Sequence, residues 1–265
     1  MKEVRAMTIN NRFYSGRDEK YGVTVNGKNF ILKPVKGKWG MAKMMSELAA
    51  SIVYKQLELP VQNVLLTKWN NEPAVLIEDF IREGQYFVPF ASLIEENFDK
   101  SGDTSYTYEN IHSTLLTHSR IENGKECLKA FWDMFVVDYL IGGGGRNASN
   151  WGFIGYEGKL SPAPVFDSSS SFYYKDYSGA PFFPPGTATS PRMTFNGAIC
   201  ERIDVIASEK YTECTNSAQY IRKKYSSIQI LDMLINAGIE KEMATDWFTA
   251  ILEYNYKRLE KIYEI

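Results

Sequence analysis

The chain has 265 residues, of which 44% are hydrophobic and 23% are charged. This composition indicates a globular protein, large enough for one domain or for two lobes with separate cores. Lys and Arg total 30 and Asp and Glu total 32, giving a net charge of −2. Composition therefore gives no electrostatic reason to expect direct nucleic-acid binding or a membrane partner.

The cysteines and the N-terminal residues indicate the cellular compartment in which the protein is expected. Cys127, Cys200 and Cys214 lack metal-ligand spacing, and only two histidines are present, which argues against a disulfide scaffold and a zinc site. The segment MKEVRAMTINNRFYSG lacks the apolar core of a signal peptide. No apolar run approaches the roughly 20 residues of a membrane span, so we expect a reducing cytoplasm.

The first ninety residues have the pattern of strands with one helix. Strands are predicted at Tyr21–Val25 and Lys28–Lys33, because Asn26-Gly27 between them is a strong hairpin signal. Pro34 is expected to end the second strand, since proline donates no hydrogen bond to the ladder.

A helix and two more strands are predicted next. The apolar stripe over Glu47–Leu57 predicts a helix, with Ser46 as its N-cap. Strands are predicted at Val61–Lys68 and Ala74–Ile77.

The remaining residues have a mainly helical pattern. Helices are predicted at Tyr108–Thr117, Gly124–Ile141, Asn216–Ala237 and Lys241–Ile262. Tyr174–Asn196 is rich in Pro, Gly, Ser and aromatic residues, which predicts a long ordered or gating loop.

This order of elements predicts an α+β fold with two lobes, as in protein kinases. The expected division is a β-rich N-lobe over residues 1–85 and a mainly helical C-lobe over residues 86–265.

Lys33 is the candidate phosphate-binding cation. Phosphoryl transfer needs a phosphate cradle, a cation, metal ligands and a residue that orients the nucleophile. Lys33 ends a strand after a hairpin, and Glu47 at the start of the next helix could hold it. The alternatives are a solvent-facing strand lysine and an ordinary first-turn glutamate favoured by the helix dipole.

The segment from Tyr14 to Gly22 is the candidate phosphate cradle. Ser15 and Gly16 precede the strand pair, as in a phosphate-covering loop. Unremarkable turns have the same composition, and the segment does not match the Gly-x-Gly-x-x-Gly of protein kinases.

Asn150 and Asp167 are the candidate metal ligands, because amide and carboxylate oxygens suit magnesium. Trp151–Ile154 and Val165–Phe166 are predicted to form a hairpin that brings both residues to one edge. The alternatives are a turn asparagine and a capping aspartate.

Several motifs then resemble the HipA-like serine/threonine kinases, in particular the small stand-alone, CtkA-type members. The motifs are FxxDxLIG, R-N-x-x-N-W-G-F and LSPAPVFD, preceded in the family's order by YSG, FILKP, SELAASIVYKQLELPV and IEDF. The resemblance covers roughly residues 12–175 and implies a kinase that transfers the γ-phosphate of ATP to a protein hydroxyl.

The resemblance also implies roles in nucleotide binding. Lys33 would contact the ATP phosphates and Glu47 would orient it. Glu78, Asp79 and Phe80 would form the hinge whose backbone meets adenine.

Asn150 and Asp167 would bind Mg²⁺, and Arg146 would stand beside the catalytic position. The family usually has G-N-x-D-R there, whereas this chain has Gly143 in place of the asparagine and Gly145 in place of the base aspartate. The glycine run fits either a flexible turn after a helix or a nest of N–H groups that binds phosphate.

Three hypotheses follow. The first is a HipA-like kinase impaired at Gly145, and the second is a nucleotide-binding pseudokinase that regulates a partner. The third is a structural or sugar-binding protein with a Gly/aromatic loop. For the kinase, the resemblance implies an unidentified protein substrate, a regulatory or antitoxin partner as in toxin–antitoxin pairs, and the bacterial cytoplasm, with secretion as an effector left open.

Overall fold

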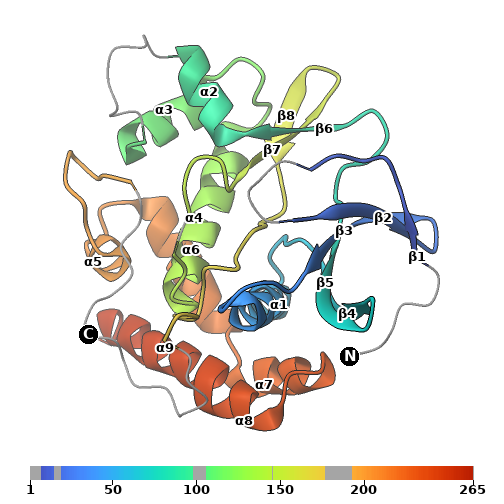
Figure 1. Ribbon diagram of the computed structural model, residues 1–265. Coiled ribbons are helices and arrows are strands. Elements are labelled where there is room, and N and C mark those ends of the chain that lie inside the picture. Colours follow the sequence, from blue (N-terminus) through green and yellow to red (C-terminus); the bar gives the residue numbers. More distant parts are fainter. Residues whose placement is uncertain (1–6, 15–18, 98–105, 145, 177–192, 265) are drawn as a thin grey trace.

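The computed structural model describes residues 7–14, 19–97, 106–144, 146–176 and 193–264. Its first part is a five-stranded antiparallel sheet in the order β1-β2-β3-β5-β4, with helix α1 (Gly40–Gln56) between β3 and β4 in the chain (Figure 1). The strands are β1 (Met7–Ile9), β2 (Tyr21–Val25), β3 (Lys28–Pro34), β4 (Val64–Trp69) and β5 (Glu72–Glu78).

The rest of the described chain is mainly helical around a small second sheet in the order β6-β7-β8. That sheet comprises β6 (Tyr86–Pro89), β7 (Gly152–Tyr156) and β8 (Lys159–Pro162). The helices are α2 (Phe90–Asn97), α3 (Tyr108–Thr117), α4 (Gly124–Leu140), α5 (Arg202–Ala207), α6 (Thr212–Lys224), α7 (Ser227–Asn236), α8 (Lys241–Met243), the π-helical η1 (Ala244–Thr249) and α9 (Ala250–Ile262).

The first hairpin forms as predicted. Asn26 and Gly27 both have positive φ, 49° and 76°, and β2 pairs with β3 from Tyr21–Leu32 to Val25–Lys28. One detail differs, because β3 extends through Pro34, which pairs with Ala74. Proline is tolerated there because the pairing of β2 with β3 ends at Leu32, so Pro34 has a ladder partner on the β5 side only.

The helix predicted at Glu47–Leu57 begins seven residues earlier, at Gly40. Ser46 is buried inside the helix and is not its N-cap, and Trp39 at the N-cap position makes no side-chain capping bond. The extra turns are stabilised by burial of Met44 and Met45, and tertiary packing of this kind replaces a local start signal.

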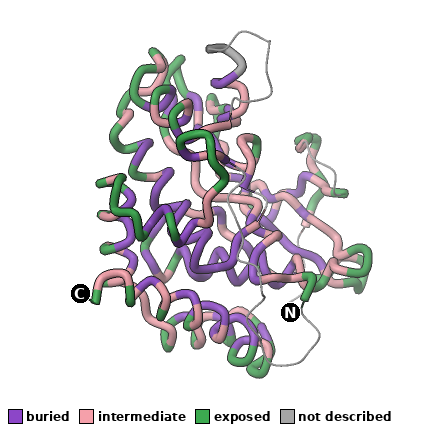
Figure 2. The backbone as a smooth tube through the Cα atoms, turned by 90° about the vertical axis from the view of Figure 1, so that its left-hand side faces the viewer, coloured by how far each residue is buried: buried purple, intermediate pink, exposed green. Residues whose placement is uncertain are grey.

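Helix α4 forms the centre of the larger hydrophobic core. Figure 2 shows buried residues, in purple, concentrated through the interior of the molecule. The predicted bounds of α3 hold, and those of α4 differ by one residue. The apolar stripe of α4 is buried as expected, at Leu128, Phe131, Trp132, Phe135, Val136, Tyr139 and Leu140.

The C-terminal helices depart from the prediction in two places. The helix expected over Asn216–Ala237 is broken into α6 and α7, and the Ser226 side chain caps α7 by accepting a hydrogen bond from the Gln229 N–H. The helix expected over Lys241–Ile262 contains the π-helical turn η1. Elements β1, β6, β8, α2 and α5 were not predicted, and most of Tyr174–Asn196 lies outside the described residues.

The two-lobed α+β architecture agrees with the predicted fold class. The larger sheet ends at Glu78 and the second sheet begins at Tyr86, while the division at residues 85 and 86 stays a prediction. None of the helices in the described part of the chain is long and apolar enough to cross a membrane.

Candidate active site

Lys33 and Glu47 form an ion pair between the sheet and α1. Lys33 Nζ lies 3.1 Å from Glu47 Oε1 and 3.3 Å from Oε2. The Lys33 side chain is 19% exposed and that of Glu47 is 6% exposed. Glu47 comes from the middle of α1, not from its first turn as predicted. Its position therefore depends on the packing of α1 and not on a helix-end preference.

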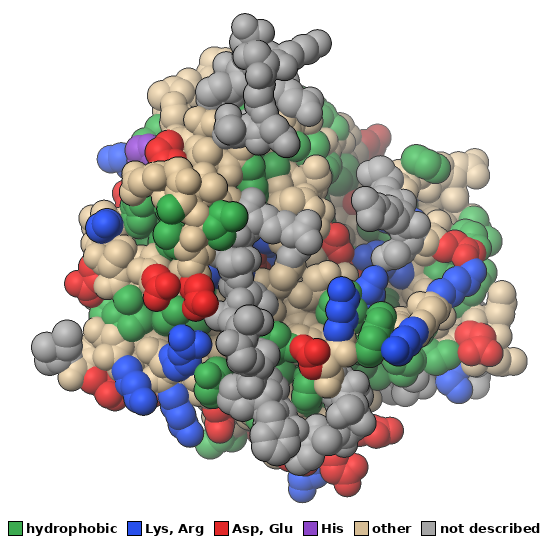
Figure 3. Space-filling model, turned by 60° about the vertical axis from the view of Figure 1, so that its left-hand side comes forward, with side chains coloured by type: hydrophobic (Ala, Val, Ile, Leu, Met, Phe, Trp, Pro, Cys, Tyr) green, Lys and Arg blue, Asp and Glu red, His purple; other side chains and the backbone are tan. Residues whose placement is uncertain are grey.

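A cavity of about 230 Å³ opens beside this pair. Lys33, Lys36 and Lys43 line it together with Glu19, Glu47 and Ser169. Lys33 is paired with Glu47 and Lys36 with Glu19, so the cavity carries a small excess of positive charge beside the segment that follows Asp167. Several basic side chains also gather right of centre on the face shown in Figure 3. The lining suits an anion with several oxygens, as a polyphosphate has.

The predicted hinge is fixed by hydrogen bonds to neighbouring strands. The Glu78 N–H donates to the Asn63 carbonyl at 2.8 Å, and the Asp79 N–H donates to the Asn29 carbonyl at 2.9 Å. The Gln62 side-chain amide donates to the Glu78 carbonyl at 3.1 Å. The N–H groups of Glu78 and Asp79 are therefore already engaged in hydrogen bonds to Asn63 and Asn29.

The Asp79 side chain anchors the segment before the candidate phosphate cradle. Arg12 Nη1 and the Tyr14 hydroxyl each lie 2.7 Å from Asp79 Oδ2. Burial and the Asp79 carboxylate together raise the pKa of Tyr14. Ser15 and Gly16 lie outside the described residues, and Gly22 lies in β2.

Phe80 connects the hinge with the segment that carries Asp167. Its ring centroid lies 6.1 Å from that of Phe87 in β6 and 6.0 Å from that of Phe166. Phe87 and Phe166 meet edge to face at 5.2 Å. This three-ring cluster joins both sheets and holds Phe166, and hence the next residue, in place.

Arg146 is the hub of the predicted catalytic and metal segments. Its Nη1 donates to the Asn150 carbonyl and to the Phe166 carbonyl, each at 2.8 Å. The two segments that carry Asn150 and Asp167 are therefore brought together by one guanidinium group. Its Nη2 also donates to the Ser168 hydroxyl at 3.1 Å.

Asp138 at the end of α4 holds this guanidinium in place. Arg146 Nε lies 2.9 Å from Asp138 Oδ2, and Nη2 lies 3.1 Å from Oδ1. Burial alone would lower the pKa of Arg146, but the Asp138 carboxylate outweighs burial and raises it. The Arg146 guanidinium is therefore charged, and Asp138 anchors the loop through its two hydrogen bonds.

The hairpin predicted to deliver Asp167 is wrong in its second strand. β7 pairs with β8 at Lys159–Pro162, whereas Val165 makes an isolated parallel bridge with Val61. Pro162 and Pro164 donate no ladder hydrogen bonds, so the hairpin ends before Val165. Asp167 has positive φ, 53°, which turns the chain sharply after Phe166.

The glycine run is a hydrogen-bonded turn over its described residues. Its N–H groups donate from Gly142 to the Tyr139 carbonyl, from Gly143 to the Asp138 carbonyl and from Gly144 to the Ser170 carbonyl. These three N–H groups are engaged, so they do not form the phosphate-binding nest considered above. Gly145, the position of the family's base, lies outside the described residues.

Arg202 of α5 is a site neighbour that the sequence did not indicate. Its Nη1 donates to the Gly143 carbonyl at 2.7 Å, and its Nη2 lies 3.8 Å from Asp138 Oδ2. Burial lowers the pKa of Arg202, while Asp138 partly counteracts this. No local motif marks an arginine that lies 59 residues beyond its partner, so only the fold reveals it.

The residues present fit a nucleotide-bound magnesium ion better than a protein-enclosed metal. No group of three or more His, Cys, Asp or Glu side chains that could hold a metal occurs within the described ranges. Magnesium commonly uses one or two carboxylates with water and substrate phosphates. Asp167, Asn150 and the adjacent basic cavity match that donor set.

The class of protein follows from a comparison with family models. The model described as the HipA-like C-terminal domain matches residues 13–239, so the chain belongs to that family. The chain is also 32% identical over 132 residues to the serine/threonine-protein kinase CtkA of Helicobacter pylori strain J99. That match covers 48% of this chain but only 40% of CtkA, less than half of the relative's length.

Solved structures show the same fold. The crystal structure of the H. pylori proinflammatory kinase CtkA matches with a TM-score of 0.83 at 20% identity, over 96% of this chain and 93% of that chain. HipA of Shewanella oneidensis MR-1, solved with HipB and operator DNA, matches with a TM-score of 0.61 at 15% identity, over 96% and 63%. The fold is thus that of the HipA-like, CtkA-type kinases.

Proposed function

We propose that this chain binds Mg-ATP in the manner of a HipA-like serine/threonine kinase and that its phosphoryl-transfer step is strongly impaired. The observation that carries the proposal is the Lys33–Glu47 pair at 3.1 Å on the wall of a basic cavity. In kinases, a strand lysine held by a helix glutamate binds the ATP phosphates. The family membership and the CtkA-like fold support the same conclusion.

Each end of the nucleotide then has expected contacts. Lys33 would bind the phosphates, with Lys43 adding positive charge from the same cavity, while the charge of Lys36 is shared with Glu19. Glu78 and Asp79 would fix the hinge through their bonds to the sheet, leaving adenine to meet the backbone near Phe80. Ser15 and Gly16 remain proposed phosphate-loop residues.

Asn150 and Asp167 are the proposed magnesium ligands. Bound Mg²⁺ would neutralise phosphate charge during transfer. Arg146 supports the two ligands indirectly, because it bonds to the backbone of Asn150 and of the residue before Asp167. It is a positioning residue, and its permanent positive charge prevents it from acting as a base.

The missing base is the reason for the expected impairment. Gly145 has no side chain to accept a hydroxyl proton, and loss of a general base commonly costs about 10²–10⁴ in rate. Asp138 is the nearest substitute in sequence, but both of its oxygens are bonded to Arg146. A carboxylate held in that way is not available to a substrate hydroxyl.

The second candidate function is a pseudokinase that binds nucleotide and regulates a protein partner. The locked state of Asp138 and the glycine at position 145 favour it over an active kinase that uses a displaced base. HipA was solved with HipB and operator DNA, and a regulatory protein partner for this chain is our proposal by analogy. A cytoplasmic location remains a further expectation.

One paired experiment tests these functions. Mg-ATP binding by calorimetry and phosphate transfer to a generic basic protein are measured for the wild-type chain, Gly145→Asp and Lys33→Met. We expect the first two to bind ATP, Gly145→Asp to transfer at least 100-fold faster than wild type, and Lys33→Met to lose binding. Absence of ATP binding by a folded wild-type chain would reject the nucleotide site.

Equal, rapid transfer by the wild-type chain and Gly145→Asp would instead reject the impairment. ATP binding without transfer by either protein would favour the pseudokinase.

A further inference from the structure

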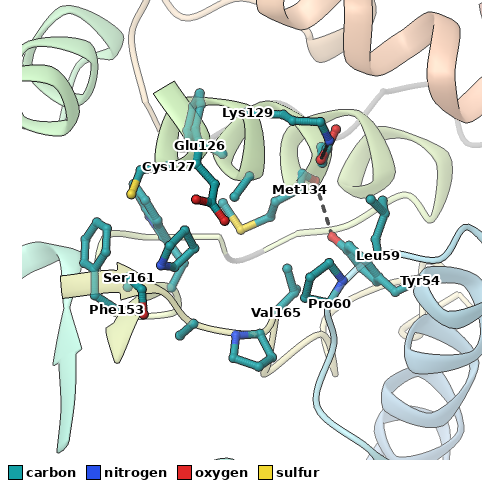
Figure 4. Close-up of a pocket in the computed structure, with 18 of the residues that line it drawn as sticks. Tyr54, Leu59, Pro60, Glu126, Cys127, Lys129, Met134, Phe153, Ser161 and Val165 are labelled. Carbon is teal, nitrogen blue, oxygen red and sulfur yellow. Dashed lines mark hydrogen bonds and ion pairs between the residues drawn. The ribbon is translucent and has the colours of Figure 1, made fainter. Parts of the chain in front are cut away.

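A second, larger cavity of about 500 Å³ lies away from the proposed nucleotide site. Figure 4 looks into it, with Glu126, Lys129 and Met134 of α4 on one side and Pro60 and Val165 across from them. Neither Lys33, Glu47, Asn150 nor Asp167 lines this cavity. Its volume lies in the range typical of small-molecule sites, about 300–1,000 Å³.

Part of the cavity lining is apolar. Pro60, Met134 and Val165 contribute side chains without hydrogen-bonding protons, and Cys127 adds a thiol. Burial raises the pKa of the Cys127 thiol to about 12, so it carries no charge near neutral pH. These surfaces favour an apolar ligand body because its burial releases water.

Asp133 supplies an unsatisfied acidic group on the same wall. It is only 6% exposed, and its Oδ2 lies 2.6 Å from Lys129 Nζ. Its Oδ1 is shielded from solvent and accepts no hydrogen bond from the described residues. Because Oδ1 is shielded, a ligand donor in the cavity would meet the other oxygen, Oδ2, which Lys129 holds.

Lys129 holds Asp133 from the solvent side. The Lys129 side chain is 60% exposed, so water and salt screen the lysine end of the pair. A ligand ammonium group could therefore replace the Lys129 ammonium at the carboxylate. Glu126 also lines the cavity and is exposed, so it adds negative charge to the wall formed by α4.

We propose that the cavity between α4 and the Pro60 and Val165 segments binds a small amphipathic amine, with its ammonium group at Asp133 and its apolar body against Pro60, Met134 and Val165. This binding site is independent of the proposed nucleotide site. The two sites are nevertheless connected through the backbone. The Gln62 N–H donates to the carbonyl of Val165 at 2.9 Å, and Val165 lies two residues before Asp167.

Tryptamine is a suitable probe, since it joins a primary amine to an apolar ring. Binding to the full chain is measured by ligand-observed NMR and calorimetry without nucleotide. Two matched probes separate charge from shape, namely neutral 3-ethylindole and anionic indole-3-propionate. We expect tryptamine to bind at least about ten-fold more tightly than either, because a charged hydrogen bond of this kind is worth about ten-fold or more.

Four variants test the position of the probe. Asp133→Asn should weaken tryptamine binding at least ten-fold, and Lys129→Met should strengthen it about three-fold or more by removing the competing cation. Ala130→Leu places extra volume on the cavity wall from a half-buried position of α4 and should abolish binding. Glu242→Gln, on exposed α8 outside the lining, is the control and should bind as wild type does.

The proposal is overturned if tryptamine does not bind at millimolar concentration, or if folded Asp133→Asn and Ala130→Leu both bind as wild type does. Displacement of tryptamine by Mg-ATP in direct competition would also overturn it, because the probe would then lie in the nucleotide site. If the chain binds no ATP, the proposed function fails, while the Asp133 and Ala130 variants still decide this proposal.

Discussion

Arg146 and Asp138 form a two-point ion pair in the interior, with Nε–Oδ2 and Nη2–Oδ1 distances of 2.9 and 3.1 Å. The side chains are 5% and 2% exposed. The pair connects the end of α4 with the backbone of Asn150 and Phe166. The geometry of the proposed metal ligands thus depends on an aspartate and an arginine that need not touch the metal.

Removal of Arg146 should strongly destabilise the chain. In Arg146→Ala, Asp138 would remain buried with only its longer, 3.8 Å contact to Arg202, and loss of one member of a buried pair costs about 3–5 kcal/mol. Urea unfolding followed by circular dichroism measures the change. Lys28→Ala is the control, because Lys28 is 61% exposed in its pair with Glu78 and should cost less than about 1 kcal/mol. A similar small loss for Arg146→Ala would contradict the proposed role.

Replacement of Lys33 should weaken nucleotide binding without unfolding the chain. Lys33→Met keeps the length of the side chain but removes the charge next to the basic cavity, so we expect at least a ten-fold loss of Mg-ATP affinity by calorimetry. Lys28→Met changes the same charge on the same strand at an exposed position and should retain affinity. Equal affinities for the two variants would exclude Lys33 from phosphate binding.

The cysteines should differ widely in reactivity. Burial raises the pKa of Cys127 to about 12 and also raises the pKa of Cys214. Both are buried, whereas Cys200 is half-buried. Because the thiolate is the nucleophile, iodoacetamide at pH 8 should modify Cys200 at least ten-fold faster than the other two, as measured by peptide mass spectrometry. Rapid modification of Cys127 in the folded chain would contradict the burial described above.

Tyr106 should make the fold sensitive to alkaline pH. Burial raises its pKa to about 12, above the ordinary value of about 10. The stabilisation that comes from this raised pKa is fully present below pH 10 and is lost as pH rises toward 12. The reason is that Tyr106 releases its hydroxyl proton at a lower pH in the unfolded chain than in the folded one. The loss should be on the order of 1 kcal/mol at pH 11.

Urea midpoints at pH 8 and pH 11 measure this effect. Tyr106→Phe should start less stable, since the Tyr106 hydroxyl accepts a hydrogen bond from Trp151 Nε1 at 3.1 Å, but should lose less stability between the two pH values. An equal loss in both proteins would assign the alkaline sensitivity to other tyrosines.

The elements that the sequence predicted well have strong local signals. Asn26-Gly27 predicts its hairpin because the turn needs positive φ, and α4 is long and periodic. The start of α1 was missed because Gly40 begins the helix without a capping side chain. Ser46 has the chemistry of an N-cap, but packing places it inside the helix.

The site could be predicted only in part, because its geometry depends on contacts distant in sequence. The Lys33–Glu47 pair followed from the order of a strand and a helix, and the structure brings the two residues together. The partners of Arg146 include Phe166, 20 residues away, and Arg202 reaches Gly143 across 59 residues. No periodicity or local motif encodes those contacts. The place of Asp133 on a cavity wall likewise could not be predicted from the sequence, because the cavity is formed by segments distant in the chain.

The close packing around the glycine turn limits which side chains fit at position 143, where the family usually has asparagine. A Cβ atom at Gly143 would lie 3.1 Å from the Asp138 carbonyl oxygen and 3.2 Å from Asp138 Oδ1. An asparagine there would have to move the residue that Arg146 holds. The turn thus sets a tolerance limit, because Gly143→Asn made alone would push on Asp138 and, through it, on the guanidinium that holds the backbone of Asn150 and Phe166.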